Sequence, residues 1–301
     1  MCYFPTIRVT IENTSMSRTL LSMNKRIIKP FIHIGYHKTG SSWLQQHLFT
    51  TNSKVFYPLS KNDAAQTTLA KHFVMDDFGN LLSPFNQNEE RIKQEISHVL
   101  TLQGAIDGRI PVISQERLSG SPGASGFDAK NIAYRLKTIF PDARILIVVR
   151  EQKSVIRSWY FQHLAMGGTE SFKQFFSANY DSQQPYFSLN HFDYLPLVKE
   201  YENLFGLENI LVLNYELFRH QPTVFFQHME SFLNVQLPID SDLFTSQTNK
   251  MTGHFVRYHA RHLNRMRRRT SFNRHAEADA CILGTATLLA VDTLPNRPRI
   301  A

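Results

Sequence analysis

The apolar run at residues 143–149 (ARILIVV) constrains the fold more than any other stretch of this chain. After Arg144 it contains only aliphatic residues, and most of them are β-branched. A short continuous run of this kind predicts a strand that is buried on both faces, as in a parallel sheet covered by helices. Residues 31–34, 110–114 and 209–213 predict three further buried strands.

Segments with helical periodicity separate these strands. They span residues 89–100, 128–140, 154–164, 195–205 and 223–233. The second segment places Ile132, Leu136 and Ile139 on one face, and Pro141 marks its end. This alternation predicts an α/β fold, a doubly wound parallel sheet flanked by helices. Residues 50–88 show few regular signals and are expected to form a long loop, such as a lid or a substrate-binding segment.

A loop that favours anion binding follows the first predicted strand. Residues 35–42 (GYHKTGSS) lie between that strand and an amphipathic helical run at residues 43–49. A strand, a glycine-bearing loop and a helix start direct backbone N–H groups and the positive end of the helix at one point. Lys38 adds a full positive charge, so the sequence predicts a site for a phosphate-like anion.

The position of the lysine separates this loop from that of nucleotide triphosphatases. Their loop reads G-x-x-x-x-G-K-[ST], with the lysine directly after the second glycine. Here Gly35 and Gly40 have the right spacing, but Ser41 stands where the lysine belongs, and Lys38 precedes Gly40. A P-loop kinase or NTPase is therefore kept as an alternative only.

The segment at residues 37–44 (HKTGSSWL) resembles the 5′-phosphosulfate loop of the sulfotransferases that use 3′-phosphoadenosine 5′-phosphosulfate (PAPS). Arg150 at a strand end, with Ser158 eight positions later, is similar to the 3′-phosphate motif of that family. Residues 210–216 and the Phe232-Leu233 pair give a softer match. The resemblance covers residues 31 to 264, and implies a P-loop-like nucleotide-binding topology like that of soluble bacterial carbohydrate sulfotransferases.

The resemblance also implies roles for particular residues. Lys38 would act catalytically, by stabilising the bridging and leaving oxygen of PAPS. Arg150 and Ser158 would hold the 3′-phosphate, Arg150 by a bidentate contact and Ser158 through its hydroxyl. Trp43 is expected to pack beneath the loop. The residues expected to bind PAPS are His37, Lys38, Thr39, Gly40, Ser41, Ser42, Trp43, Arg150 and Ser158.

Transfer of the sulfuryl group to an acceptor hydroxyl needs a base that takes the proton of that hydroxyl. The resemblance implies that this base lies at the end of the strand predicted at residues 110–114, next to the donor. Some members of the family carry a histidine there and others a glutamate; this chain offers Glu116. A partly desolvated carboxylate has a raised pKa and can take a proton from a hydroxyl. His33, His37 and His163 stay open as alternatives, and so does a surface role for Glu116 paired with Arg117.

Composition limits the partners without choosing among them. The net charge of +8 favours anionic ligands in general. The Arg- and His-rich run at 257–274 leaves open a non-enzymatic polyanion or nucleic-acid binder, although such a run is more often a solvated helix face. Cys2 and Cys281 provide neither a metal-ligand spacing nor a disulfide framework. No metal site is expected, and nucleic acid is not the expected partner.

The expected organisation has three parts. Residues 1–27 form a leader, either disordered or preceding the true start at Met16 or Met23; residues 28–269 form the α/β domain; and residues 270–301 form a tail. No apolar run of about 18 residues predicts a transmembrane helix, so the expected location is cytoplasmic. The expected acceptor is a hydroxyl or an amine, with a carbohydrate or glycolipid hydroxyl favoured.

Overall fold

A parallel sheet forms the centre of the computed structural model, which describes residues 29–59, 73–74, 84–99, 108–165, 167–177, 187–239, 262 and 264. The sheet has five strands in the order β2-β3-β1-β4-β5, and every pairing is parallel. Their bounds are β1 Phe31–Gly35, β2 Phe56–Pro58, β3 Ile110–Ser114, β4 Arg144–Val149 and β5 Ile210–Asn214. The α/β fold that the sequence predicts is confirmed.

The strand order reverses at β1. The chain leaves β1 for β2 and β3 on one side of it, and then crosses to β4 and β5 on the other. In sheets of this class, ligands bind outside the carboxyl ends of the strands at such a switch point. The segments that follow Gly35 of β1, Ser114 of β3 and Val149 of β4 therefore surround the position where a ligand is expected.

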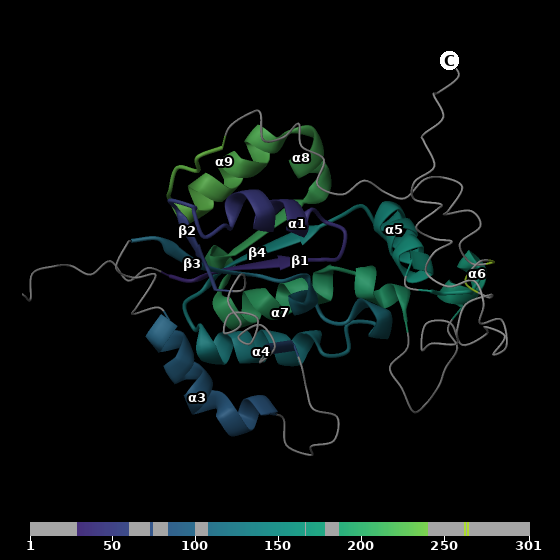
Figure 1. Ribbon diagram of the computed structural model, residues 1–301, viewed down its shortest axis with the longest axis horizontal. Coiled ribbons are helices and arrows are strands. Elements are labelled where there is room, and N and C mark those ends of the chain that lie inside the picture. Colours follow the sequence, from purple (N-terminus) through teal and green to yellow (C-terminus); the bar gives the residue numbers. More distant parts are fainter. Residues whose placement is uncertain are drawn as a thin grey trace, which may run out of the picture.

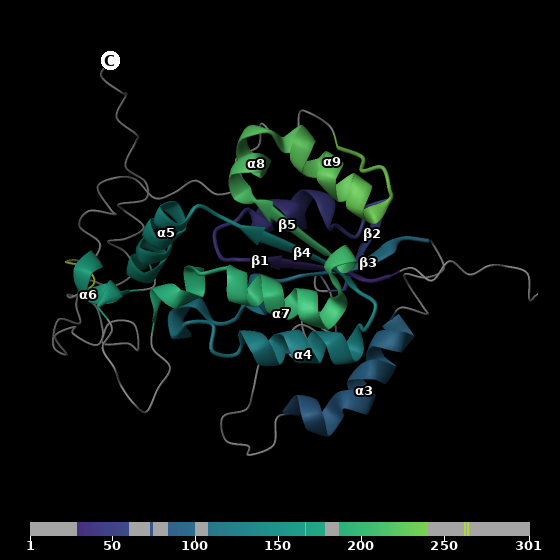
Figure 2. The same cartoon turned by 180° about the vertical axis from the view of Figure 1, so that it is seen from behind.

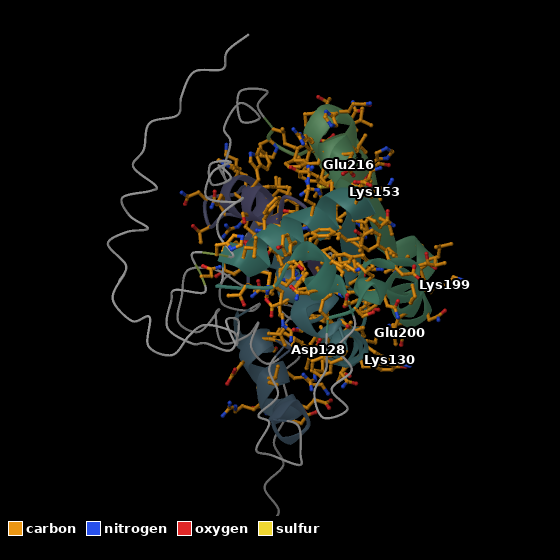
Figure 3. The ribbon with its side chains drawn as sticks, turned by 90° about the vertical axis from the view of Figure 1, so that its right-hand side faces the viewer. Asp128, Lys130, Lys153, Lys199, Glu200 and Glu216 are labelled. Atoms are coloured by element: carbon orange, nitrogen blue, oxygen red, sulfur yellow. The ribbon has the colours of Figure 1, made fainter. Side chains whose placement is uncertain are left out.

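Helices cover both faces of the sheet (Figure 1). On one face lie α3 (Pro84–Val99), α4 (Ala129–Ile139) and α7 (Leu195–Phe205); on the other lie α1 (Ser41–Trp43), α8 (Tyr215–His220) and α9 (Pro222–Leu233). Figure 2 shows the same two layers from behind. Lys130 of α4 and Glu200 of α7 lie side by side in Figure 3, with their charged atoms 3.9 Å apart.

The strand β4 shows why both faces are covered. Ile145 and Ile147 belong to the core under α4 and α7, whereas Leu146 and Val148 belong to the core under α9. All four side chains are buried. Alternate side chains of a strand point to opposite faces, so an uninterrupted apolar run needs two hydrophobic layers.

Two helices lie beyond the carboxyl end of the sheet. These are α5 (Gln152–Ala165), which follows β4, and α6 (Phe172–Phe176) (Figure 1). The turn before α6 is fixed by a capping box between Ser171 and Gln174. The sequence signals predict α5 but give no prediction of α6.

The expected loop at 50–88 contains regular structure. Its three-residue strand β2 is an edge strand with a proline, and α3 begins at Pro84, five residues before the predicted start. A strand this short shows no period, and proline argues against a strand except at an edge. The short helix α8 also differs from expectation, because it starts directly after β5 with the Asn214 side chain accepting from Leu217 N at 2.8 Å.

Several expectations fall outside the described residues. They are the leader at 1–27, the tail at 270–301, Cys2 and Cys281, and the basic run at 257–274 apart from His262 and Asn264. Within the described ranges, no helix is long and apolar enough to cross a membrane.

Candidate active site

The loop after β1 has an unusual backbone. Lys38 has a φ of 70° and Gly40 a φ of 86°, both in the left-handed region. That conformation costs a non-glycine residue of order 1–3 kcal/mol and is concentrated at functional sites. The helix that follows begins as one turn of α1 and continues as the π-helical segment η2 (Leu44–Leu48). The strained loop therefore follows the carboxyl end of β1 directly, and α1 and the π-helical segment continue from it.

The loop presents several polar groups without partners. In the described part of the chain, the backbone N–H groups of residues 37–40 donate no hydrogen bond, and the buried Ser41 hydroxyl has no partner. Gly35 lies so close that an added Cβ would overlap the Ser41 hydroxyl. Buried polar groups are nearly always hydrogen-bonded, so this loop fits an anionic ligand.

Lys38 is held by the helix after β4. Its ammonium donates a hydrogen bond of 2.6 Å to Gln162 Oε1 on α5. Burial lowers the pKa of Lys38; the charge of Glu116 opposes this shift and the charge of Arg150 adds to it. The lysine is therefore a partly desolvated cation whose nearest charged neighbours come from the ends of β3 and β4.

Arg150 ties the loop to the start of α5. Its Nη1 donates to the backbone oxygen of Lys38 at 2.7 Å, and its Nε donates to Ser154 Oγ at 2.8 Å. Its guanidinium also lies 4.7 Å from the ring centroid of Tyr215. Ser158 is half-buried one turn beyond Ser154, on the same face of α5. Arg150 and Ser154 therefore lie beside the strained loop, and Ser158 follows Ser154 on the same face of α5.

The starts of α5 and α8 lie next to each other beside Arg150. The backbone N–H of Glu151 donates to Glu216 Oε1 at 3.3 Å. Figure 3 shows Lys153 of α5 and Glu216 of α8 close to each other. Tyr194 completes this arrangement, because its hydroxyl donates to the backbone oxygen of Arg150 at 2.7 Å.

Glu116 starts the short helical turn η4 (Glu116–Ser119) after β3. Burial raises its pKa, and the charge of Lys38 acts in the opposite direction. Arg117, the neighbour with which a surface Glu116 would pair, instead forms an ion pair with Asp128. Glu116 is thus half-buried and electrostatically coupled to Lys38.

The histidines occupy different environments. His33 is fully buried, shares a hydrogen bond of 2.8 Å with Ser114 Oγ, and has a pKa lowered to about 3 by burial. His163 shares a hydrogen bond of 2.7 Å with Glu170. His37 lies against Trp159, and burial lowers its pKa to about 4. The hydrogen bond of His33 therefore joins the neighbouring strands β1 and β3.

Trp43 lies beneath the loop in the core under α9. Its side chain is 8% exposed and packs against Phe218 and Phe226, with ring centroids 5.2 and 6.0 Å away. Phe218 and Tyr215 also approach Gly40 from the same side. This environment agrees with the packing role expected for Trp43.

A comparison with protein-family models identifies the domain. The model described as the sulfotransferase domain matches residues 29–279, which is most of the chain. The chain belongs to the sulfotransferase family. The donor of that family is PAPS, so this sulfotransferase is an enzyme that takes its sulfuryl group from PAPS.

Solved structures resemble the sulfotransferase over most of its length. A sulfotransferase from Alicyclobacillus acidocaldarius is 20% identical, with a TM-score of 0.48 and coverage of 71% of this chain and 88% of that one. The sulfotransferase domain from the curacin biosynthetic pathway is 17% identical (TM-score 0.41; coverage 76% and 82%). Mouse sulfotransferase SULT7A1 complexed with PAP is 12% identical (TM-score 0.39; coverage 81% and 67%). No curated protein sequence matches the chain.

The sulfotransferase brings the residues singled out in its sequence to one end of the sheet. The loop at 37–42, Arg150 and Glu116 follow the adjacent strands β1, β4 and β3. Sequence reasoning missed Gln162, Ser154 and Tyr215, which contact Lys38 or Arg150 through side chains. Only for Ser154 did the sequence offer a signal, because it lies four residues after Arg150, a spacing that allows side-chain contact. In the described residues, no cluster of metal-ligating side chains is found.

Proposed function

We propose that this sulfotransferase transfers the sulfuryl group of PAPS to a hydroxyl of a carbohydrate or glycolipid acceptor, with Lys38 and Glu116 as its catalytic residues. The observation that carries the proposal is the placement of these two residues after the carboxyl ends of the adjacent strands β1 and β3, where the charge of each acts on the pKa of the other. A cation for the leaving group and a base for the attacking group are the two functions that such a transfer needs.

The donor would be held at both of its phosphates. The N–H groups of the loop and the Ser41 and Ser42 hydroxyls offer donors to the 5′-phosphosulfate, with Thr39 fixed by its own hydrogen bond of 2.5 Å to Tyr36 O. Arg150, with Ser154 and Ser158 beside it, offers a planar guanidinium to the 3′-phosphate. Lys38 adds a second positive charge beside the donor, and Trp43 supports the loop through packing.

The reaction follows from these positions. The acceptor oxygen forms a bond to sulfur while the bond between sulfur and the bridging phosphate oxygen breaks. Glu116 takes the proton of the acceptor hydroxyl, and Lys38 stabilises the negative charge that develops on the leaving oxygen. The products are the sulfated acceptor and adenosine 3′,5′-bisphosphate (PAP). Such a transfer depends on positioning and on charge stabilisation, as phosphoryl transfer does.

The carbohydrate or glycolipid nature of the acceptor rests on the chemistry of the base. A carboxylate accepts a hydrogen bond from an alcohol and takes its proton as bonding to sulfur proceeds, which suits a weakly acidic sugar hydroxyl. Burial raises the pKa of Glu116, and the positive charge of Lys38 acts against this rise. An amine acceptor would need the same proton transfer.

Donor selectivity tests the proposal against a kinase or NTPase. Isothermal titration should show binding of PAP without a metal ion, and weaker binding of ATP with Mg²⁺. Arg150→Ala should weaken binding of PAP more than binding of ATP, because only PAP carries a 3′-phosphate. Tighter binding of ATP with Mg²⁺ than of PAP would contradict the proposal and favour the nucleotide triphosphatase alternative.

A further inference from the structure

A group of unpaired polar atoms lies beside the candidate active site. Among the described residues, buried side-chain atoms without a hydrogen-bond partner include His37 Nδ1, Arg117 Nη1, Trp159 Nε1 and His191 Nε2. Leaving one such group unpaired in the protein interior costs roughly 1–3 kcal/mol. Natural proteins seldom accumulate several of them without a ligand or ordered water to pair with them.

These four side chains, termed the polar cluster, come from different elements but neighbour one another. The ring centroids of His37 and Trp159 are 5.5 Å apart. The charges of His191 and Arg117 both act on His37, and the charge of Arg117 also acts on His191. His191 belongs to the turn η6 (Leu189–Phe192) and Trp159 to α5, so four separate segments converge.

Two members of the polar cluster neighbour the catalytic residues along the chain. His37 directly precedes Lys38, and Arg117 directly follows Glu116. Two of its members, Trp159 and His191, are 7% and 6% exposed, so their unpaired atoms are well shielded from solvent. Residues 120–126 pack beside these two side chains: a Cβ on Gly126 would lie 2.6 Å from His191 Nδ1, and a Cβ on Gly123 would lie 4.0 Å from the Trp159 ring.

The atoms of the polar cluster both donate and accept. The indole N–H of Trp159 and the guanidinium N–H of Arg117 are donors only. Burial lowers the pKa of His37 and of His191 to about 4, so each ring is neutral at pH 7 and can accept as well as donate. The Arg117 charge is compensated by Asp128. A neutral ligand with several hydroxyls, each both donor and acceptor, matches this set.

A cluster of packed aromatic side chains adjoins the same atoms. Trp159 packs with Phe192, and Phe175 and Phe187 pack against that pair from α6 and from the segment before η6. Aromatic faces next to polar edges suit sugar rings, which present C–H groups on one side and hydroxyls around the rim. A simple phenol or aliphatic alcohol would leave most of the polar cluster unpaired.

We infer that the polar cluster of His37, Arg117, Trp159 and His191 is the acceptor subsite, and that it binds the non-reacting hydroxyls of a neutral polyhydroxylated acceptor. This inference rests on the proposed function, because it places the acceptor's reactive hydroxyl between Lys38 and Glu116. The polar cluster then determines specificity, whereas the catalytic pair performs the chemistry.

The variant Trp159→Phe tests the inference, since it removes one unpaired N–H and keeps an aromatic ring. The probes are cellobiose, maltose, p-nitrophenol and 1-octanol, each added to the full-length enzyme saturated with PAP. Saturation-transfer NMR should detect one or both disaccharides but neither p-nitrophenol nor 1-octanol. Trp159→Phe should weaken disaccharide binding about tenfold, the equivalent of roughly 1.4 kcal/mol, with the affinity for PAP unchanged.

Tyr201→Phe is the matched control. Among the described residues, the Tyr201 hydroxyl is also buried and unpaired, but it belongs to the core under α4 and α7, where its ring packs on Phe205. The Tyr201→Phe variant should bind disaccharides and PAP as the parent does. The inference is overturned if neither disaccharide binds the complex with PAP, if p-nitrophenol or 1-octanol binds in their place, or if Trp159→Phe binds disaccharides as the parent does. Failure of PAP itself to bind would instead overturn the proposed function.

Discussion

The Lys38 ammonium donates a hydrogen bond of 2.6 Å to Gln162 Oε1, from a loop to a helix 124 residues further along the chain. The backbone oxygen of the same lysine accepts from Arg150 at 2.7 Å. Both the side chain and the backbone of Lys38 are therefore held by the β4–α5 unit. The cation is oriented without a ligand, so little ordering remains when the donor binds.

Gln162→Glu should lower kcat about tenfold. A carboxylate at this position would form an ion pair with Lys38, and the ammonium would then stabilise the leaving oxygen less well. Gln162→Ala should have a smaller effect, because it removes only the orienting contact. Steady-state kinetics of both variants would measure this order, with Gln152→Glu at the exposed start of α5 as the control. Equal kcat values for Gln162→Glu and the parent would contradict the proposed role of this contact.

Arg150→Lys should raise the KM for PAPS roughly tenfold to a hundredfold, with a smaller change in kcat. Lysine keeps the charge but loses the planar fork that can contact a phosphate through two N–H groups while retaining Ser154. Donor titrations of the variant would establish this value. Arg157→Lys, a change at an exposed position of α5, should keep the parent KM. An unchanged KM in Arg150→Lys would remove Arg150 from the 3′-phosphate site.

The pH dependence of kcat/KM should be bell-shaped. Glu116 acts as a base only when ionised, and burial raises its pKa, so activity should fall on acidification at a pH above the ordinary value of 4.5. Lys38 acts only when protonated, and burial lowers its pKa, so activity should fall on alkalinisation below 10.5. Rate profiles between pH 5 and pH 10 would define both limbs.

Glu116→Gln should lose most of the turnover and the acidic limb, and retain PAP binding. The exposed Glu208→Gln should keep the parent profile. A Glu116→Gln enzyme with an unchanged acidic limb would assign the base to another group.

Gly35→Ala should destabilise the protein by roughly 1–3 kcal/mol and weaken PAP binding, because its Cβ would overlap the Ser41 hydroxyl and displace the loop. Thermal denaturation and PAP titration would measure the two effects. In Gly123→Ala, by contrast, the new Cβ would meet only the Trp159 ring at 4.0 Å, an ordinary contact, so stability should hold. Parent-like stability and donor affinity in Gly35→Ala would show that the loop tolerates displacement.

The central strands and most helices could be predicted because their patterns are local. The run that forms β4 is apolar on both faces, and α7 spans the predicted residues 195–205. The edge strand β2 could not be predicted, since three residues with a proline show no period and pair only through their contact with β3. The five-residue α6 is fixed by its cap, a signal too short to separate from a turn.

The residues of the candidate site also fall into those with a local sequence signal and those without one. Lys38 and Arg150 belong to recognisable sequence motifs, and the structure brings the two segments together. Gln162 has no such signal, because its contact with Lys38 depends on the packing of α5 beside the loop. The partner of Arg117 also depends on the fold: it is Asp128 at the start of α4, and not its neighbour Glu116. Contacts between distant segments therefore had to come from the structure.

Transfer of radiolabelled sulfate tests the central claim most directly. The enzyme would be incubated with PAPS labelled in its sulfuryl group and a panel of oligosaccharides and glycolipids, and compared with Lys38→Ala and with Lys153→Ala, a change at an exposed lysine of α5. The parent and Lys153→Ala should label an acceptor, and Lys38→Ala should lose about a hundredfold or more in rate. Transfer by Lys38→Ala at the parent rate would contradict the account.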